Sequence, residues 1–223
     1  MIRFENVGMR YGTGPEILRD LTFTVEPGAF CFLTGASGAG KSSLLRLMYL
    51  AHAPSRGLIS LFGRDIATTP REELPPLRRQ IGVVFQDFRL IPNLTALENA
   101  ALPLRIAGKT EADTRRHAEE LLRWVGLGPF IEHYPPALSG GQQQRVAVAR
   151  AVIAQPKLLL ADEPTGNLDE EIGGRLMHLF VEMNKLGTSI VIATHNMGLV
   201  RRHGGRTLHL VDGELAPGGG DAP

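Results

Sequence analysis

The stretch GASGAGKSS, residues 35–43, decides the fold of this chain. It follows an apolar run, AFCFLT (29–34), and it opens SSLLRLMYLA (42–51), whose apolar residues recur on one helical face. The spacing Gly-x-x-x-x-Gly-Lys-Ser, between a strand and a helix, is that of a loop whose backbone amides bind phosphate. A glycine-rich turn that merely precedes a helix is the alternative, and the flanking strand and helix argue against it.

Each position of this loop has an expected part in binding a nucleoside triphosphate. The glycines let the backbone curl so that successive N–H groups point at the phosphates. Lys41 is expected to place its charge on the β- and γ-phosphates, and Ser42 to place its hydroxyl on Mg²⁺. The expected nucleotide-binding residues of the loop are Gly35, Ala36, Ser37, Gly38, Ala39, Gly40, Lys41, Ser42 and Ser43.

Four continuous apolar runs predict a parallel sheet that helices cover on both faces, because strands buried on both sides do not alternate. The runs are residues 29–34, 81–85, 157–162 and 189–194. Each run ends at a residue able to do chemistry: the loop of residues 35–43, then Gln86, the Asp162–Glu163 pair and His195. Ligands bind at the carboxyl ends of such strands, so these residues are expected at one edge.

The two acids, in LLLADEP, are expected to divide the work of hydrolysis. Adjacent strand residues point opposite ways, so the two carboxylates are not equivalent. Asp162 suits Mg²⁺, through a water, and Glu163 suits the general base that deprotonates the attacking water. Two solvated acids in a turn before Pro164 are the alternative.

Gln86 and His195 complete the expected chemistry. Gln86 is expected to touch Mg²⁺ or the attacking water and to sense the γ-phosphate. A surface glutamine is the alternative. His195 is expected to donate to the γ-phosphate, against the alternative of a histidine in the core. The other six histidines have no metal-ligand spacing, so no zinc site is expected.

A second phosphate-binding device is predicted at LSGGQ, residues 138–142, at the start of a helix. Ser139 is a favourable cap, and a helix start binds anions through free amides and the dipole. The surrounding segment, residues 88–155, is patterned as helices, with caps expected at Thr95 (capping box with Glu98) and at Thr110. Trp124 in this segment is expected to pack.

These patterns predict an α/β fold: a P-loop NTPase (RecA-like) core with an N-terminal antiparallel β subdomain and an inserted α-helical subdomain. The alternating runs near Ile2–Phe4 and in LTFTV (21–25) favour the antiparallel sheet. One domain is expected over 1–223. Its core comprises 1–87 and 156–215, its helical subdomain is 88–155, and a Gly/Pro-rich tail, 216–223, is expected to be disordered.

Composition narrows the function classes. The 223 residues include 24 Lys and Arg against 23 Asp and Glu, without a basic stripe, so no nucleic-acid partner is expected. The single cysteine, Cys31, fits a buried thiol in a reducing compartment. No signal peptide, no lipidation motif and no apolar run near ~18 residues is visible, so a cytoplasmic protein with no direct lipid anchor is expected.

The chain resembles the ATP-binding subunits of ABC transporters over nearly its full length. The resemblance is carried in family order by GASGAGKSS (Walker A), LSGGQ (signature), LLLADE (Walker B), NLD (167–169, D-loop) and ATHN (H-loop). It implies ATP and Mg²⁺ as ligands and Tyr11 as the aromatic that stacks on adenine. It also implies an ATP-dependent homodimer, in which Ser139, Gly140, Gly141, Gln142 and Asp169 help to bind nucleotide across the subunit boundary. Ser43 and Asn196 stand where relatives commonly have Thr and Asp.

Within the family, the chain most resembles the FtsE-type cell-division ATPases, which act with an integral membrane protein of the FtsX type. That resemblance implies a peripheral place on the inner face of the cell membrane, through the partner. The alternative is the ATPase of a lipoprotein-release or macrolide exporter, which shares QQQRVAVARAV and LLLADEPTGNLD almost equally. A DNA-repair or translation ATPase typically has a long coiled coil or two ATPase units, which this chain lacks. A scaffold without turnover fits poorly with Glu163.

Overall fold

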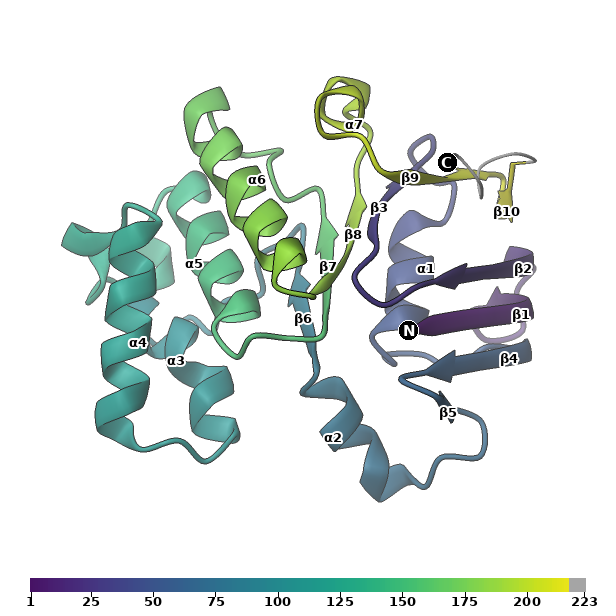
Figure 1. Ribbon diagram of the computed structural model, residues 1–223, viewed down its shortest axis with the longest axis horizontal. Coiled ribbons are helices and arrows are strands. Elements are labelled where there is room, and N and C mark those ends of the chain that lie inside the picture. Colours follow the sequence, from purple (N-terminus) through teal and green to yellow (C-terminus); the bar gives the residue numbers. More distant parts are fainter. Residues whose placement is uncertain (217–223) are drawn as a thin grey trace. The chain divides into compact units, whose positions relative to one another are not determined.

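The structure is a computed structural model that describes residues 1–216. The disorder expected for the tail falls on residues 217–223, which lie outside the described residues. The chain forms two compact units, one of residues 1–78 with 187–223 and the other of residues 79–186. Figure 1 labels the elements of each, and we describe each unit by itself.

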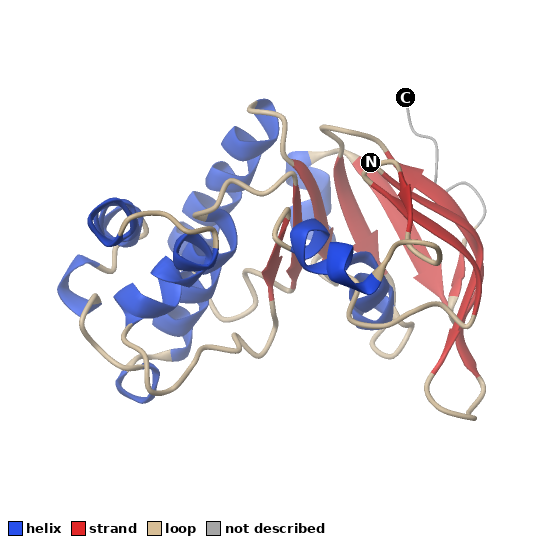
Figure 2. Cartoon of the chain, turned by 90° about the horizontal axis from the view of Figure 1, so that it is seen from below, coloured by secondary structure: helices blue, strands red, loops and turns tan. Residues whose placement is uncertain are grey.

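The first unit contains an antiparallel sheet near the N-terminus, drawn among the red strands of Figure 2. Its strands, in the order β2-β1-β4-β5, are β1 (Ile2–Arg10), β2 (Glu16–Val25), β4 (Arg56–Leu61) and β5 (Arg64–Asp65). Alternation places Phe4 and Phe23 on the buried face, where they pair across β1 and β2 with ring centroids 4.6 Å apart. The antiparallel sheet expected from the sequence is confirmed, and β4 and β5 extend it.

The same unit contains parallel strands that lead to the phosphate loop. Strand β3 (Phe30–Thr34) lies between β8 (Ser189–Ala193) and β9 (Arg206–Val211), parallel to both. The short β10 (Glu214–Leu215) pairs antiparallel with β9. Cys31 on β3 is fully buried, as expected, and burial raises the pKa of its thiol. The helices of this unit are α1 (Lys41–Met48), α2 (Leu74–Arg78) and α7 (Met197–His203).

The second unit is mainly helical around one parallel strand pair. Strands β6 (Ile81–Val84) and β7 (Leu158–Asp162) pair in parallel. The helices are α3 (Ala96–Ile106), α4 (Glu111–Trp124), α5 (Gly140–Val152) and α6 (Glu170–Lys185). Helices α3, α4 and α5 share a core built on residues such as Leu97, Leu122 and Val146. Together the two units give the α/β fold with a P-loop core, an antiparallel β part and an inserted helical part; the segment boundaries at 87/88 and 155/156 stay predictions.

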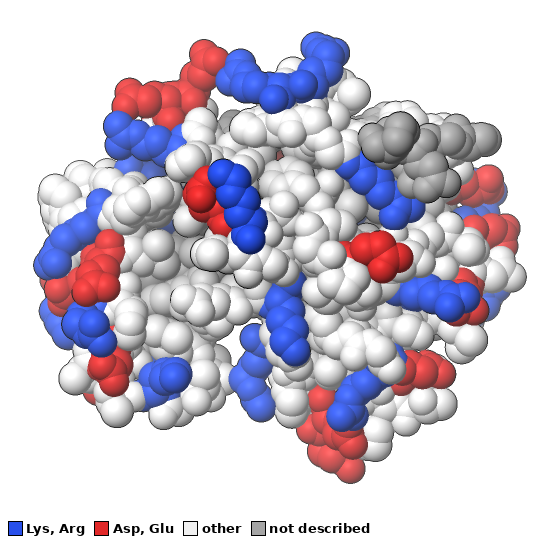
Figure 3. All heavy atoms as spheres, viewed as in Figure 1, with Lys and Arg blue, Asp and Glu red and all other residues white. Residues whose placement is uncertain are grey.

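The expected helix caps are present, and one packing expectation is wrong. Thr95 and Glu98 form a capping box at the start of α3, and Thr110 caps α4 by accepting from the amide of Asp113. Trp124, expected to pack, is instead 50% exposed at the end of α4, because the buried stripe of that helix runs through Thr114, Ala118 and Leu122. On the face shown in Figure 3, basic and acidic side chains lie beside one another.

Candidate nucleotide-binding site

The phosphate loop is a tight turn that only glycine permits at two of its positions. It leaves β3 after Thr34 and ends at Gly40, the N-cap of α1. Gly35 has φ +146°, and a Cβ there would lie 2.3 Å from the carbonyl oxygen of Leu210. Gly40 has φ +104°, and a Cβ there would lie 2.7 Å from the Leu18 side chain. The turn therefore keeps a bare backbone where phosphate is expected.

Lys41 supplies a cation at the mouth of this turn. Its Nζ donates to the carbonyl oxygens of Gly35, at 2.8 Å, and Ala36, at 2.9 Å. No acidic residue lies in the first turn of α1, which follows directly. A lysine, a helix N-terminus and a glycine turn thus come together, and this arrangement fits a polyphosphate.

Tyr11 lies in the same unit, next to α1. Its Oη is 3.1 Å from Ser43 Oγ and accepts from Arg46 Nη1 at 2.9 Å. The Arg46 guanidinium carbon lies 5.9 Å from the Tyr11 ring centroid, and the His52 ring meets the Tyr11 ring edge-on at 5.2 Å. The hydrogen bond to Tyr11 raises the pKa of Arg46. The ring, 36% exposed, is held from several sides while part of it remains accessible.

His195 follows β8 at the same edge of the sheet as the phosphate loop. Strands β3 and β8 are parallel neighbours, and the amide of Thr194 donates to the carbonyl of Leu33 at 3.0 Å. His195 is exposed just beyond. Asn196 caps α7, because its Oδ1 accepts from the amide of Leu199 at 3.0 Å. Asn is one of the residue types that cap a helix start well.

In the second unit, Gln86 and Asp162 come to one edge of the β6–β7 pair. Val84 is in register with Ala161, so Asp162 ends β7 where the chain leaves β6 toward Gln86. Gln86 is exposed and Asp162 is half-buried. Within residues 1–216 no group of three His, Cys, Asp or Glu side chains is placed to hold a metal. The Asp162 carboxylate and the Gln86 amide offer hard oxygen ligands of the kind that suits Mg²⁺, which also takes phosphate and water.

Glu163 has left the strand. Its φ is +48°, in the left-handed region that a non-glycine residue rarely occupies. Its carbonyl accepts from the amide of Gly166 at 3.2 Å in the turn that follows β7. Asp162 and Glu163 are therefore separated by a backbone turn rather than by strand alternation, which corrects the reason expected from the sequence. Such strained residues cluster at functional sites.

The second phosphate device is a capped helix start. Ser139 Oγ accepts from the amide of Gln142 at 3.3 Å, and Gln142 Oε1 accepts from the amide of Ser139 at 2.8 Å. Within residues 1–216, the amides of Gly140 and Gly141 donate to no protein acceptor. A Cβ on Gly140 would meet no atom within 4 Å, so this start of α5 is open.

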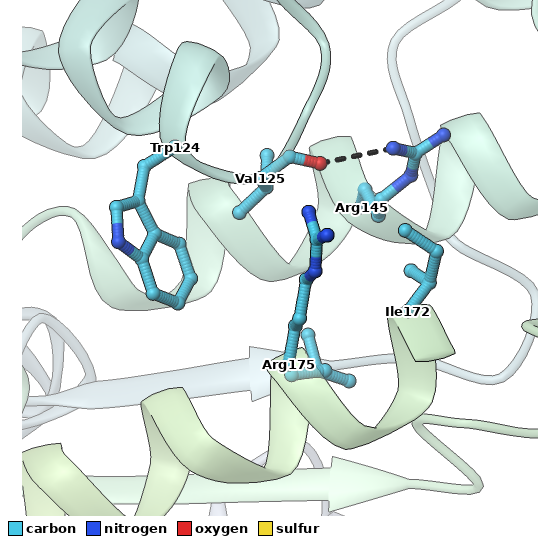
Figure 4. Close-up of a pocket in the computed structure, with 6 residues that line it drawn as sticks. Trp124, Val125, Arg145, Ile172 and Arg175 are labelled. Atoms are coloured by element: carbon cyan, nitrogen blue, oxygen red, sulfur yellow. Dashed lines mark hydrogen bonds between the residues drawn. The ribbon is translucent and has the colours of Figure 1, made fainter. Parts of the chain in front are cut away.

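Two other segments lie next to the first turns of α5. Arg145 Nη1 donates to the carbonyl of Val125, at the C-terminal end of α4, at 3.0 Å, as Figure 4 shows. A Cβ on Gly141 would lie 3.2 Å from the carbonyl oxygen of Asn167, in the turn that leads to α6. Asp169 ends that turn and caps α6 by accepting from the amide of Ile172 at 2.9 Å. Asp169, in the D-loop, therefore stabilises the start of α6 within its own chain.

The hollow drawn in Figure 4 holds none of the predicted site residues. It is lined by Trp124, Val125, Arg145, Ile172, Arg175 and Leu176. Its lining comes mainly from α4 and α6 and includes no residue that was predicted for the site. It is therefore no part of the candidate site.

The predicted residues fall into two groups. Tyr11, residues 35–43 and His195 lie in the first unit, and Gln86, residues 139–142, Asp162, Glu163 and Asp169 lie in the second. The sequence reasoning missed Arg46, Arg145 and Arg150, each of which bonds a backbone carbonyl or an aromatic hydroxyl at least 19 residues away in the chain. Their only sequence signal is a basic residue inside an apolar helix, which a solvated side chain gives equally.

Comparisons with known proteins agree with these features. A family model described as ABC transporter matches residues 18–166. The cell division ATP-binding protein FtsE of Escherichia coli K12 is 47% identical over 99% of both chains. The FtsE of Bacillus subtilis is 39% identical over 96% of this chain and 93% of its own. A solved dimer of the ATP-binding cassette MJ0796, bound to ADP and Pi, matches with TM-score 0.90 and 36% identity over 96% of each chain.

Proposed function

Because the chain belongs to the ABC transporter family of ATP-binding proteins, as an ATPase similar to FtsE, we propose that it powers a membrane complex in cell division. In this proposal it binds MgATP, dimerises on it, hydrolyses it to ADP and phosphate, and acts on an FtsX-like integral membrane protein. It works at the inner face of the membrane through that partner. No helix in residues 1–216 is long and apolar enough to cross a bilayer.

The chain's own residues divide the work on ATP. Lys41 and the amides of residues 35–43 hold the phosphates, and Tyr11 stacks on the adenine. Ser42, Asp162 and Gln86 would hold Mg²⁺, and the ion would supply positive charge to the phosphates. Glu163 orients the attacking water and takes its proton, while His195 donates to the γ-phosphate.

The single observation that carries the dimer proposal is the open start of α5. The amides of Gly140 and Gly141 point out of a capped helix toward no protein acceptor within residues 1–216. Gly141 lies beside Asn167 and Leu168, in the turn that precedes Asp169. A γ-phosphate bound to the phosphate loop of a second copy supplies the missing anion. Each ATP is then shared by two subunits, and Ser139, Gly140, Gly141, Gln142 and Asp169 complete the partner's site. The solved cassette dimer supports this reading.

The region just after Gln86 is the proposed contact for the membrane partner. Ile91 is 36% exposed, whereas Leu90 packs against the helical core. ATP-driven closure of the dimer would move this surface and the partner with it. An exporter of lipoproteins or macrolides remains the second candidate, because its ATPase shares the same motifs.

Glu163→Gln tests the enzyme proposal. The amide keeps the shape of the carboxylate but cannot accept a proton, so ATP binding should persist while phosphate release falls about a hundredfold or more. With ATP the variant should elute as a dimer in size exclusion. Lys41→Ala, which removes the phosphate-binding cation, is the control that should lose ATP affinity. Hydrolysis by Glu163→Gln at the wild-type rate would exclude Glu163 as the base.

The same variant separates the two membrane functions in the native cell. If Glu163→Gln replaces the natural chain, cells should chain or filament while the level of the membrane partner stays normal. Normal division together with mislocalised lipoproteins or lost efflux would instead support the exporter.

A further inference from the structure

Arg150, near the C-terminal end of α5, holds two backbone carbonyls of the segment that follows Gln86. Its Nη1 donates to the carbonyl of Arg89 at 2.6 Å, and its Nη2 donates to the carbonyl of Phe88 at 2.7 Å. Both distances are at the short end for charge-assisted bonds. Within residues 1–216 this cation forms no ion pair with a carboxylate, and burial lowers its pKa. Burying a cation that bonds only to carbonyls costs free energy unless its hydrogen bonds are well formed. The position of Arg150 therefore indicates a specific role for these two bonds.

The backbone that Arg150 holds is strained. Phe88 and Arg89 have φ of +58° and +49°, two successive non-glycine residues in the left-handed region. The amide of Arg89 donates to the carbonyl of Asp87 at 2.6 Å, which closes a very tight turn directly after Gln86. The turn directs the carbonyls of residues 88 and 89 toward the Arg150 guanidinium. The two hydrogen bonds to that guanidinium stabilise the turn.

The next residues of the segment are anchored to a different helix. Asn99 on α3, fully buried, accepts from the amide of Ile91 at 2.8 Å and donates to the carbonyl of Ile91 at 3.1 Å. The segment after Gln86 is thus held at Ile91 by α3 and at residues 88–89 by α5. The α5 contact is the one that lies nearer to Gln86.

We propose that Arg150 is a positioning residue for Gln86. Through Arg150, the segment that carries this γ-phosphate sensor is connected to α5, and the signature lies at the opposite end of that helix. The proposal rests on the proposed function, in which Gln86 meets Mg²⁺ or the attacking water. Ser139 and Arg150 are both part of one rigid helix, about 16 Å apart at 1.5 Å per residue. A shift of α5 on binding the second subunit's nucleotide therefore moves the backbone beside Gln86 in the same chain.

Steady-state hydrolysis by the full-length chain tests the positioning role. Arg150→Lys keeps the charge but loses the fork that grips two carbonyls. We expect kcat to fall about tenfold while KM for ATP changes less than about twofold, because Gln86 is misplaced and the phosphate loop is intact. Arg116→Lys, on the exposed face of α4 where Arg116 pairs with Asp113, is the matched control and should leave both constants unchanged. A lower melting temperature with unchanged kcat would show that Arg150 is only a structural anchor, and would overturn the proposal.

A backbone rescue shows whether the effect passes through the strained turn. Arg89→Gly relieves the left-handed strain, whereas Arg89→Ala removes the same side chain and keeps the strain. In the Arg150→Lys background, Gly at position 89 should recover part of kcat and Ala should not. Equal effects of Gly and Ala would overturn the proposal.

Hydrogen exchange in nucleotide-free protein gives a test independent of turnover. Amides of residues 86–91 should exchange faster in Arg150→Lys than in the wild-type chain, by about tenfold, because the turn opens more often. Unchanged exchange there would overturn the proposal. A wild-type chain that does not hydrolyse ATP would instead contradict the proposed function, and the exchange result would still decide the role of Arg150.

Discussion

At the scale of single residues, the protein itself orients the Tyr11 ring, which is proposed to stack on adenine. Arg46 and Ser43 both hydrogen-bond the hydroxyl, and His52 contacts the ring, so the side chain is oriented by the protein alone. A ring fixed before binding loses little rotamer entropy when it stacks on a ligand. The hydroxyl, which plays no part in stacking, thus acquires a role in orientation.

Arg46→Met should therefore weaken ATP binding by about three- to tenfold while leaving tripolyphosphate binding unchanged, because only base stacking needs the oriented ring. Calorimetric titration with the two ligands measures the difference. Tyr11→Phe, which removes the hydroxyl on the other side of the same bond, should give a similar loss. An equal loss for both ligands would mean that Arg46 acts on the phosphates.

At the scale of elements, Ser139 caps the start of α5, and in the proposed dimer it also contacts the nucleotide of the second copy. Ser139→Arg fills the open helix start with a bulky cation, so a single chain should still bind ATP while dimerisation and hydrolysis are lost. The variant should also lose about 1 kcal/mol of stability with the cap. Size exclusion and phosphate release measure the first effect, and thermal unfolding measures the second.

Thr110→Arg is the matched control, because it removes the cap of α4 outside the candidate site. It should lose similar stability and keep dimerisation. If Ser139→Arg abolished ATP binding by the isolated chain, the signature would serve the site of its own subunit.

The sequence predicted those elements whose signal is local. The phosphate loop and the caps at Thr95 and Thr110 depend on residues within a few positions, and all are present. Strands β4 and β9 were missed, because each reads as a short alternating run and its pairing with β1 or β3 is distant in the chain. The same limit explains why the grip of Arg150 on residues 88–89, 61 positions or more away, was not expected.

At the scale of the whole molecule, the predicted site residues are divided between two units that are formed by different parts of the chain. The first unit is built from both ends of the described chain, and the second is built from the middle. The phosphate loop and His195 thus come from segments about 155 residues apart that β3 and β8 bring to one sheet edge, by the pairing rule for parallel strands. A truncation that removes β9 would take away a neighbour of β3 and with it the support of the loop.

The rate at which Cys31 is chemically labelled reports how often this unit opens. It is the chain's single cysteine and its side chain is fully buried on β3, so a thiol reagent reaches it only when the packing over this sheet opens. Labelling by an aromatic disulfide should be slow in native protein, and the absorbance of the released thiolate measures its rate. ATP at 100 times its dissociation constant should slow labelling by up to about a hundredfold, because ligand binding stabilises the closed form in that proportion. The Lys41→Ala chain should show no such delay, and the ratio of the two rates then reports nucleotide affinity without any measurement of turnover.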